Sequence, residues 1–405
     1  MPTGLNRIMA VLAVTQIIGW GSSFYLPGII GRHIARDLDI SSGVVYGGVS
    51  VMVITSALLS PRVGKALDRH GTRLFMAAGS VLLAAGLVAL AMAEGPLTYL
   101  AAWAIIGVAS VLALALPAMT TLAQAAGGAA RRAMVILMLF SGLSSSIVWP
   151  LTAAIEPMLG WRGVCWVYAA AHLAIGLPLH LFGLRARRQA AAPGAPVASV
   201  SEGTVRPGRE RLAFIAVAAA FSLSGFVSWG LSLHVITLLE AGGLSATSAL
   251  AWGSALGVMQ VAARIVDFTL GKGASPLHLA IVATAALPCS FVLLALTAVA
   301  PLFAVLFIVA YAVASGLIAV SRVTLPLWLF GAAVYGTASG RLMLAQNVAF
   351  GIAPVVFAAV MEHGFGYAVG LALLSGLGSL AAIVTVLASV ERRAHASGSS
   401  TGAID

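Results

Sequence analysis

Charged side chains are scarce in this chain. Only 8% of its 405 residues are Asp, Glu, Lys or Arg, whereas 60% are hydrophobic and the mean hydropathy is +1.04. A water-soluble protein of this size cannot bury so much apolar surface. The composition therefore excludes a soluble globular domain and indicates a protein that crosses a membrane several times.

Cysteine and acidic residues are also few. The two cysteines, Cys165 and Cys289, lie inside apolar runs, which excludes a disulfide framework and a thiolate metal site. The 12 acidic residues are outnumbered by 22 lysines and arginines, giving a formal charge of +10. Because the basic residues fall between the apolar runs, we attribute this excess to cytoplasmic loops and expect no nucleic-acid partner.

The sequence offers no recognisable machinery for catalysis. It contains no Walker-type phosphate loop, no His/Cys metal cluster and no nucleophile–base arrangement. We therefore expect neither an enzyme nor an ATP-driven pump, and no cofactor or metal.

Long apolar runs dominate the chain instead. A membrane-spanning helix needs roughly 20 mainly apolar residues, and twelve runs have about this length. No small-residue cleavage site follows the first run, so we take it as a helix and not as a signal peptide. The fold class predicted is an all-α polytopic membrane protein. Its expected spans are 8–30, 43–61, 74–93, 97–121, 133–156, 163–184, 212–239, 246–270, 276–299, 301–325, 339–361 and 365–389.

Lysine and arginine orient these helices. They gather in alternate loops. The turns on the other side hold fewer basic residues and more acidic ones: Arg32, Arg36 and Arg162 against Asp37, Asp39, Glu94, Glu240 and Glu362. The positive-inside rule then places both termini in the cytoplasm, with the protein in the inner (plasma) membrane. The expected domains are a six-helix bundle at 1–184, a basic cytoplasmic linker at 185–211, a second six-helix bundle at 212–391 and a cytoplasmic tail at 392–405.

The two halves carry similar local patterns at offsets near half the chain length. Repeats of this kind are typical of two related bundles that enclose a central site. The matching pairs are Gly19-Trp20-Gly21 with Ser228-Trp229-Gly230, Tyr25 with His234, and Gly64-Lys65-x-x-Asp68 with Ala263-Arg264-x-x-Asp267.

A polar segment, residues 64–73, separates the second and third apolar runs. Its spacing Gly-x-x-x-Asp-Arg-x-Gly-x-Arg resembles the motif between helices 2 and 3 of the major facilitator superfamily, and the twelve runs extend this resemblance over nearly the whole chain. The resemblance implies two pseudo-symmetric six-helix bundles. Glycine at 64 would let two helices approach closely, and Asp68 would lie at the positive end of a neighbouring helix. The expected gating residues are Gly64, Asp68, Arg69, Gly71 and Arg73.

Polar side chains inside the apolar runs are the candidate site residues. A charged group at mid-bilayer costs about 2.5–3.5 kcal/mol, so it is expected to face a cavity or a partner. Arginine suits a carboxylate ligand, because it stays charged and presents a bidentate fork of donors. The candidates for substrate binding are Gln16, Tyr25, His234, Gln260, Arg264, Arg322, Gln346 and Asn347.

Several candidates have structural alternatives that the sequence leaves open. Arg264 either binds an anion in the central cavity or pairs with Asp267, three residues later on the same helix. Arg322 either faces the cavity or lies at the membrane interface. His234 is either a pH-sensitive ligand or a packed neutral side chain. The two amides of the eleventh run either line the cavity or bond across helices.

The eighth run shows a narrower resemblance. Gln260-Val-Ala-Ala-Arg264 is similar to the Asp-x-x-x-Arg motif on helix 8 of the monocarboxylate transporter and oxalate–formate antiporter branch. This resemblance covers only short stretches and implies that the arginine binds a substrate carboxylate. The acid of that motif is implicated in proton coupling, but a glutamine cannot titrate. Asp267 and His234 are therefore the candidates for proton coupling.

These patterns predict a secondary transporter that moves a small, monocarboxylate-like organic anion by alternating access, with proton coupling or anion exchange. Its expected partners are the anion, protons and the lipid bilayer, and the protein is expected to be monomeric. Two alternatives stay open: an efflux permease for a neutral or amphipathic compound, and a transporter-like sensor that carries no solute. The fifth run lacks the Gly-Pro-x-x-Gly-Gly element typical of drug/proton antiporters, which argues against a cationic-drug exporter.

Overall fold

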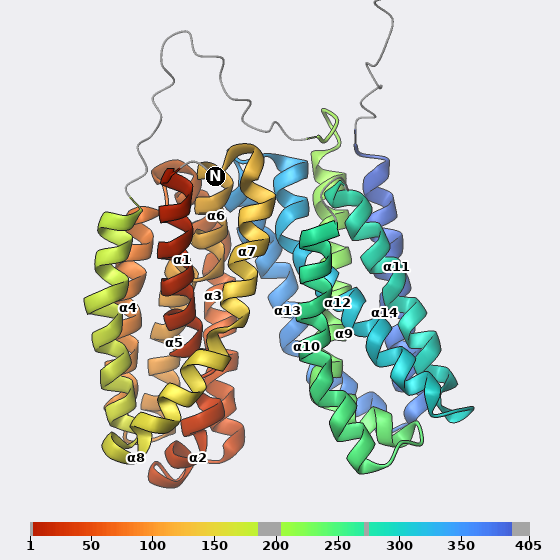
Figure 1. Ribbon diagram of the computed structural model, residues 1–405, viewed down its shortest axis with the longest axis horizontal. Helices are drawn as coiled ribbons and strands as arrows, with labels where there is room; N and C mark the ends of the chain where they lie inside the picture. The colour runs from red at the N-terminus through yellow and green to blue at the C-terminus, as the bar shows by residue number, and fades with distance from the viewer. Residues whose placement is uncertain (1–2, 185–203, 271–274, 391–405) are drawn as a thin grey trace, which may run out of the picture.

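The computed structural model describes residues 3–184, 204–270 and 275–390, and these residues are almost entirely helical (Figure 1). Within these ranges the extended structure is a single bridge between Val205 and Val390. The predicted all-α fold is confirmed. Most of the expected linker and the whole expected tail, 392–405, lie outside the described residues, so those domain boundaries remain predictions.

The first half of the chain contains several membrane passes that are broken into two pieces. α1 and α2 are separated by a turn at 22–26, and α5 and α6 meet at Leu114, whose backbone is not helical. Gly160, with φ 66°, interrupts α8, and the chain turns back there (Figure 1). The helices are α1 (Thr3–Gly21), α2 (Pro27–Asp37), α3 (Ser42–His70), α4 (Arg73–Ala91), α5 (Pro96–Ala113), α6 (Ala115–Ala125), η1 (Gly127–Ala129), α7 (Ala130–Gly142), α8 (Ser144–Ala171), η2 (His172–Gly176) and η3 (Leu179–Gly183).

The second half has simpler, unbroken passes. They are α9 (Glu210–Ala241), α10 (Ala246–Leu270), α11 (Pro276–Ala295) with the short turn η4 (Leu296–Ala298), α12 (Leu302–Phe330), α13 (Tyr335–Met361) and α14 (Phe365–Leu387).

The helix count agrees with twelve passes. Nine helical stretches of the described residues are long and apolar enough to span a membrane. One of them, 127–183, contains the reversal at Gly160 and therefore makes two passes. The pair α1–α2 and the helix α13 supply the other two.

Two expected boundaries are wrong. The first pass does not run unbroken over 8–30, because it stops at Gly21 and resumes as α2, which continues to Asp37 through the expected loop. The second pass does not end at residue 61 either, before the polar segment 64–73. α3 extends to His70, so only Gly71 and Thr72 form the turn, and Gly71 adopts the φ of 78° that glycine tolerates best.

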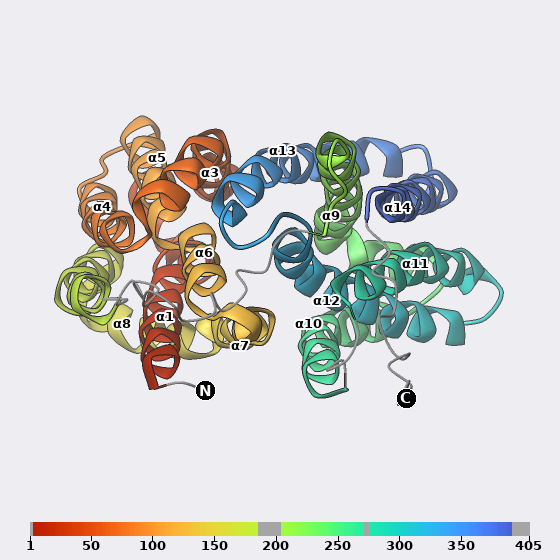
Figure 2. The same cartoon turned by 90° about the horizontal axis from the view of Figure 1, so that it is seen from above.

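The helices form two bundles that lie side by side, α1–α8 in one and α9–α14 in the other (Figure 2). Each bundle has its own apolar core. The first is centred on buried side chains such as Trp103 and Tyr99, and the second on Phe291, Phe307 and Tyr311. This is the pair of bundles expected from the internal repeat.

The bundles touch most closely where α3 crosses α13. A Cβ atom on Gly64 would lie 2.0 Å from the Gly336 carbonyl oxygen, and one on Gly340 would lie 2.2 Å from the Ser60 carbonyl oxygen. The Ser60 hydroxyl donates to the Gly340 carbonyl at 2.7 Å. Backbones can approach this closely only where side chains are missing, so glycines on both helices determine this contact.

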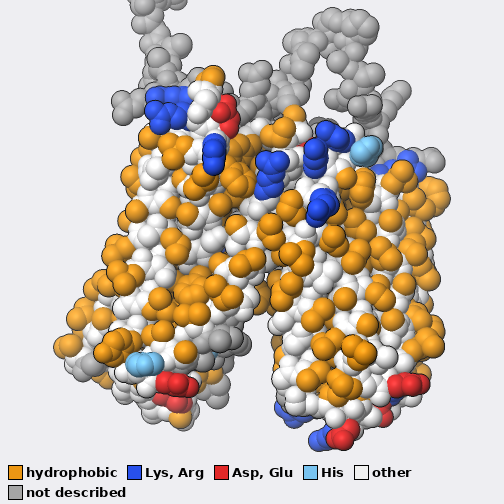
Figure 3. All heavy atoms as spheres, turned by 180° about the vertical axis from the view of Figure 1, so that it is seen from behind, with side chains coloured by type: hydrophobic (Ala, Val, Ile, Leu, Met, Phe, Trp, Pro, Cys, Tyr) orange, Lys and Arg blue, Asp and Glu red, His pale blue; other side chains and the backbone are white. Residues whose placement is uncertain are grey.

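The two bundles are in contact at one end of the molecule and apart at the other end (Figure 3). The N-terminus and the start of α9, which follows the linker, lie at the end where the bundles touch (Figure 1), and the other end is split by an open cleft (Figure 3). Lys and Arg side chains gather near the closed end, whereas most of the Asp and Glu side chains seen in this view lie near the open end (Figure 3). The molecule is therefore open toward the side opposite the linker.

Candidate functional site

A cavity of about 290 Å³ lies between the two bundles. Its walls come from α1, α3, α5 and α6 of the first bundle and from α9, α12 and α13 of the second. Most of the lining is apolar or aromatic, with a few hydroxyl and amide groups. The lining residues are Trp20, Phe24, Met52, Val53, Ser56, Ser110, Val111, Leu114, Ala115, Leu116, Met119, Trp229, Arg322, Val323, Tyr335, Ser339, Leu342, Met343, Gln346, Asn347 and Phe350.

Arg322 is the only charged side chain among these lining residues. Its guanidinium carbon lies 4.9 Å from the centroid of the Phe350 ring, a cation–π distance. Its Nε atom is buried and has no hydrogen-bond partner within the described ranges. The alternative of an interfacial arginine is therefore wrong, because Arg322 faces the cavity.

Arg264 lies close to this cavity without belonging to its lining. It is half-buried on α10, it repels Arg322 electrostatically, and it interacts with Tyr25 of the first bundle. Its Nε atom is also buried without a hydrogen-bond partner in the part of the chain that the structure describes. Two permanent cations therefore lie near one another. None of the three ion pairs found among the described residues involves either of them.

The first contact between the bundles is a helix cap. The Asp68 carboxylate accepts hydrogen bonds from the backbone amides of Gly336 and Thr337, at 2.9 and 2.6 Å. These amides belong to the first turn of α13, where unpaired N–H groups favour a negative charge. Asp68 thus lies at the positive end of a neighbouring helix, as its motif predicts, although its role in gating remains a prediction.

A second contact joins α7 to α10. The Arg131 guanidinium lies 3.3 Å from the Asp267 carboxylate, and Arg132 lies over the Phe268 ring at 5.1 Å. The expected alternative, a pair between Arg264 and Asp267, is therefore wrong: Asp267 reaches the other bundle instead. The repeat aligns Asp68 with Asp267, and both join the two bundles. Asp68 of the first bundle binds α13 of the second, and Asp267 of the second bundle binds α7 of the first.

Comparison with known proteins now identifies the fold. A family model described as the Major Facilitator Superfamily matches residues 11–354. The chain belongs to this superfamily. No curated protein sequence matches it.

Two solved structures of superfamily transporters are similar to this chain. The human organic anion transporter MFSD10 (TETRAN) has a TM-score of 0.72 and 16% sequence identity, over 95% of this chain and 100% of that one. The proton:xylose symporter XylE, bound to 6-bromo-6-deoxy-D-glucose, has a TM-score of 0.68 and 14% identity, over 94% of each chain. At these identities the likeness shows the transporter fold alone.

The remaining polar candidates of this superfamily member are divided between the cavity and the helix packing. Gln346 and Asn347 line the cavity. Gln16 is almost fully buried in the first bundle, where it donates to the Ala113 carbonyl at 2.9 Å and accepts from the Trp20 indole at 3.2 Å. Its polar atoms are therefore occupied by helix packing.

Three further candidates lie outside the cavity lining. Gln260 donates to Ser315 at 3.0 Å, which joins α10 to α12. His234 interacts with the Gly230 carbonyl on its own helix at 2.8 Å. Tyr25 lies in the turn after α1 and packs edge-on against Trp149, with ring centroids 6.2 Å apart. Each of these groups has a packing role in the conformation seen here.

Two buried histidines are absent from the sequence-based candidates. His172 in η2 bonds with Ser22 at 2.8 Å, and His180 in η3 bonds with Ser80 at 2.8 Å. Each is only 2% exposed, so both are more deeply buried than Asp267, the acid expected to take part in proton coupling. Both lie in π-helical turns of the sixth pass, and the sequence contained no periodic signal for them.

The other gating candidates lie around the turn between α3 and α4. Arg69 is exposed on the last turn of α3, whereas Arg73 begins α4 and is half-buried. Neither contacts the cavity. Their place near the closed end fits a role at the contact between the bundles, which remains a prediction.

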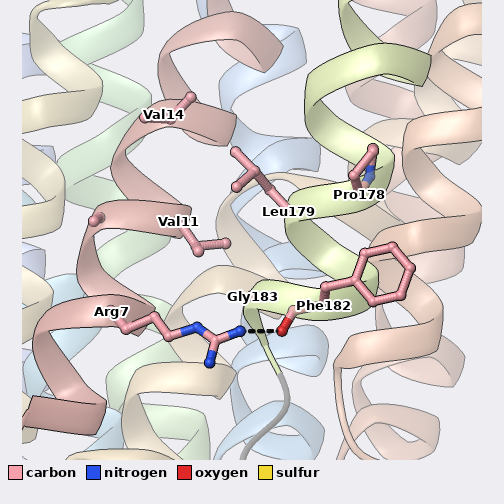
Figure 4. Close-up of a pocket in the computed structure, with 8 residues that line it drawn as sticks. Arg7, Val11, Val14, Pro178, Leu179, Phe182 and Gly183 are labelled. Atoms are coloured by element: carbon pink, nitrogen blue, oxygen red, sulfur yellow. Dashed lines mark hydrogen bonds between the residues drawn. The ribbon is translucent and has the colours of Figure 1, made fainter.

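A second hollow, of about 480 Å³, lies on the outer surface between α1 and η3. Its walls are apolar side chains such as Val11, Val14 and Leu179, and Arg7 at one end donates to the Phe182 carbonyl (Figure 4). None of its residues lines the central cavity. It is a surface groove and not part of the candidate site.

We expect Asp68→Asn to slow transport far more than it weakens substrate binding. The carboxylate makes two charge-assisted hydrogen bonds to α13, and such bonds contribute about 1.5–3 kcal/mol each. Their loss should shift the equilibrium between open and closed states by roughly tenfold or more. Transport rate and ligand affinity would be measured on the same preparation. Asp39→Asn, an exposed acid at the other end, is the control, and a normal rate in Asp68→Asn would remove the gating role.

Proposed function

We propose that this protein is a secondary transporter that carries a small organic anion across the inner membrane by alternating access. The observation that supports this most strongly is Arg322, a cation in the central cavity without a carboxylate partner among the described residues. A charge in an apolar surrounding is costly, so a resident cation needs a negative ligand. A substrate carboxylate fits this need.

The second arginine strengthens the proposal. Arg264 and Arg322 repel one another, so an anion bound near both would relieve this repulsion as well as pair with each charge. The amides Gln346 and Asn347, with the hydroxyls of Ser56, Ser110 and Ser339, would fix its orientation through hydrogen bonds. The walls are otherwise apolar, which suits a small organic anion better than a sugar.

The conformation fits one state of an alternating-access cycle. The bundles are held together near the linker by the contact of α3 with α13 and by the Arg131–Asp267 pair, and they are apart at the other end (Figure 3). If the basic loops are cytoplasmic, as the positive-inside rule predicts, the cavity here faces away from the cytoplasm. Both termini would then be cytoplasmic.

Proton coupling remains part of the proposal, with anion exchange as its alternative. Asp267 forms half of the pair that joins α7 to α10, so its protonation would weaken the closed contact. Proton binding to Asp267 would thus act on the contact between α7 and α10 and not on the substrate cavity. His234 stays the other proposed proton-coupling residue.

Carboxylate binding to the purified wild-type protein tests the proposal, and its absence would overturn it; binding to Arg264→Lys protein tests the part assigned to Arg264. Lysine keeps the positive charge but loses the bidentate fork, so affinity should fall roughly ten- to hundredfold while thermal stability is kept. The measurement is the shift in unfolding temperature with increasing carboxylate concentration. Arg36→Lys, an exposed arginine on α2, is the control. Unchanged affinity would show that Arg264 is not an anion ligand.

A further inference from the structure

Aromatic rings from both bundles meet in the same cavity as Arg322. Trp20 and Phe24 belong to the first bundle, with ring centroids 6.0 Å apart. Phe24 meets Trp229 of the second bundle edge-on at 6.3 Å, and Trp229 stacks on Phe350 at 5.5 Å with 13° between the ring planes. The Arg322 guanidinium lies over the same Phe350 ring at 4.9 Å. A continuous series of rings therefore ends at the cation.

The stacked pair depends on a particular glycine. Gly225 lies one helical turn before Trp229 on α9, and a Cβ atom there would lie 1.8 Å from a ring carbon of Phe350. The absence of a side chain at 225 lets the Phe350 ring lie against the α9 backbone. In that position the ring is nearly parallel to Trp229. The sequence thus holds a flat aromatic surface next to Arg322.

These rings differ from the aromatic residues that fill the protein core. Phe221, Phe291 and Phe307 have no exposed surface in the second bundle, whereas Trp20, Phe24 and Trp229 are only partly buried. Aliphatic side chains would serve equally well if the cavity needed only apolar volume. Partly exposed ring faces and edges beside a cation are suited to a ligand that has both a ring and a negative charge.

We propose that the transported anion is an aromatic carboxylate, with its carboxylate on Arg322 and its flat ring against Trp229 and Phe24. This rests on the proposed function and specifies its substrate class. Two aromatic rings attract each other through edge-to-face or offset-stacked contacts, beyond the apolar area that they bury. A saturated ring of the same size buries similar area but lacks this attraction. The cavity should therefore discriminate between the two rings when both carry the same carboxylate.

Three probes test this on the purified full-length protein: benzoate, cyclohexanecarboxylate and acetate. We expect benzoate to bind roughly two- to tenfold more tightly than cyclohexanecarboxylate, measured by calorimetry. Trp229→Leu should abolish this preference, whereas Trp229→Phe should keep part of it. Trp166→Leu, a change at an exposed tryptophan of α8, should leave the preference intact.

The outcomes separate this inference from the proposed function. If all three carboxylates bind but benzoate has no advantage over cyclohexanecarboxylate, the aromatic inference is overturned and the anion proposal stands. If none of the three binds, the anion proposal fails and the inference fails with it. The comparison of the three probes on the wild-type protein needs no variant. It therefore tests the preference for an aromatic carboxylate even if Trp229→Leu does not fold.

Discussion

Arg322→Gln is expected to bind a small carboxylate roughly ten- to hundredfold more weakly than the wild-type protein while remaining fully folded. Among the described residues that line the cavity of about 290 Å³, Arg322 is the only charged one. The loss of a charge-assisted hydrogen-bonded pair costs about 1.5–3 kcal/mol, which corresponds to the stated change in affinity. Calorimetric titration with benzoate would give this number directly.

The unliganded stability of this variant separates a binding role from a structural one. Arg322 repels Arg264, and neither takes part in an ion pair among the described residues, so its removal should leave the unfolding temperature unchanged or raise it. If Arg322 instead stabilised the fold, its removal should lower the unfolding temperature. The matched control is Arg162→Gln, which removes an arginine paired with Asp37 outside the cavity. That variant should keep its carboxylate affinity.

Gly64→Ala is expected to reduce transport by more than tenfold without impairing the helix that carries it. The added methyl group would lie 2.0 Å from the Gly336 carbonyl oxygen and 3.3 Å from Gly340. Backbone atoms cannot rotate away from such a contact, so α3 and α13 must move apart. The closed contact between the bundles would then weaken, and the cycle would lose one of its two end states.

Weakening of the closed contact can be measured as increased access of a reagent to the cavity. In a Ser339→Cys background, a membrane-impermeant maleimide should label Gly64→Ala faster than its parent from the linker side. The control is Gly47→Ala on the same helix, where a Cβ atom would have no neighbour within 4 Å. Alanine favours helix over glycine by about 1 kcal/mol, so neither change weakens α3 itself. Equal labelling of the two variants would show that the glycine contact does not control closure.

Much of this architecture could be predicted from the sequence, because membrane passes and repeats leave strong signals. The apolar runs gave the passes, and the repeat aligned Trp20 with Trp229, which do line one cavity from opposite bundles. The motif around Asp68 correctly implied a helix end as its partner. Each of these inferences used residue spacing or composition, which can be determined from the sequence without knowing the fold.

Which face of each helix turns inward could not be predicted. Lipid tails and helix cores are both apolar, so hydropathy does not distinguish the two sides of a transmembrane helix. For this reason Gln16 and Arg322 looked alike as candidates, although Gln16 is tied to Ala113 and Arg322 faces the cavity. The partner of Asp267 was missed for another reason. Arg131 is 136 residues away in sequence, whereas Arg264 is close on the same helix.

Counterflow in proteoliposomes tests the central claim most directly. Vesicles containing the purified protein would be loaded with an unlabelled carboxylate, and uptake of the labelled compound would be followed with no other driving force. We predict that benzoate or another small carboxylate accumulates transiently in wild-type vesicles and about tenfold or more slowly in Arg322→Gln vesicles. Exchange of a neutral sugar or a lipophilic cation, with no exchange of any carboxylate, would contradict the account.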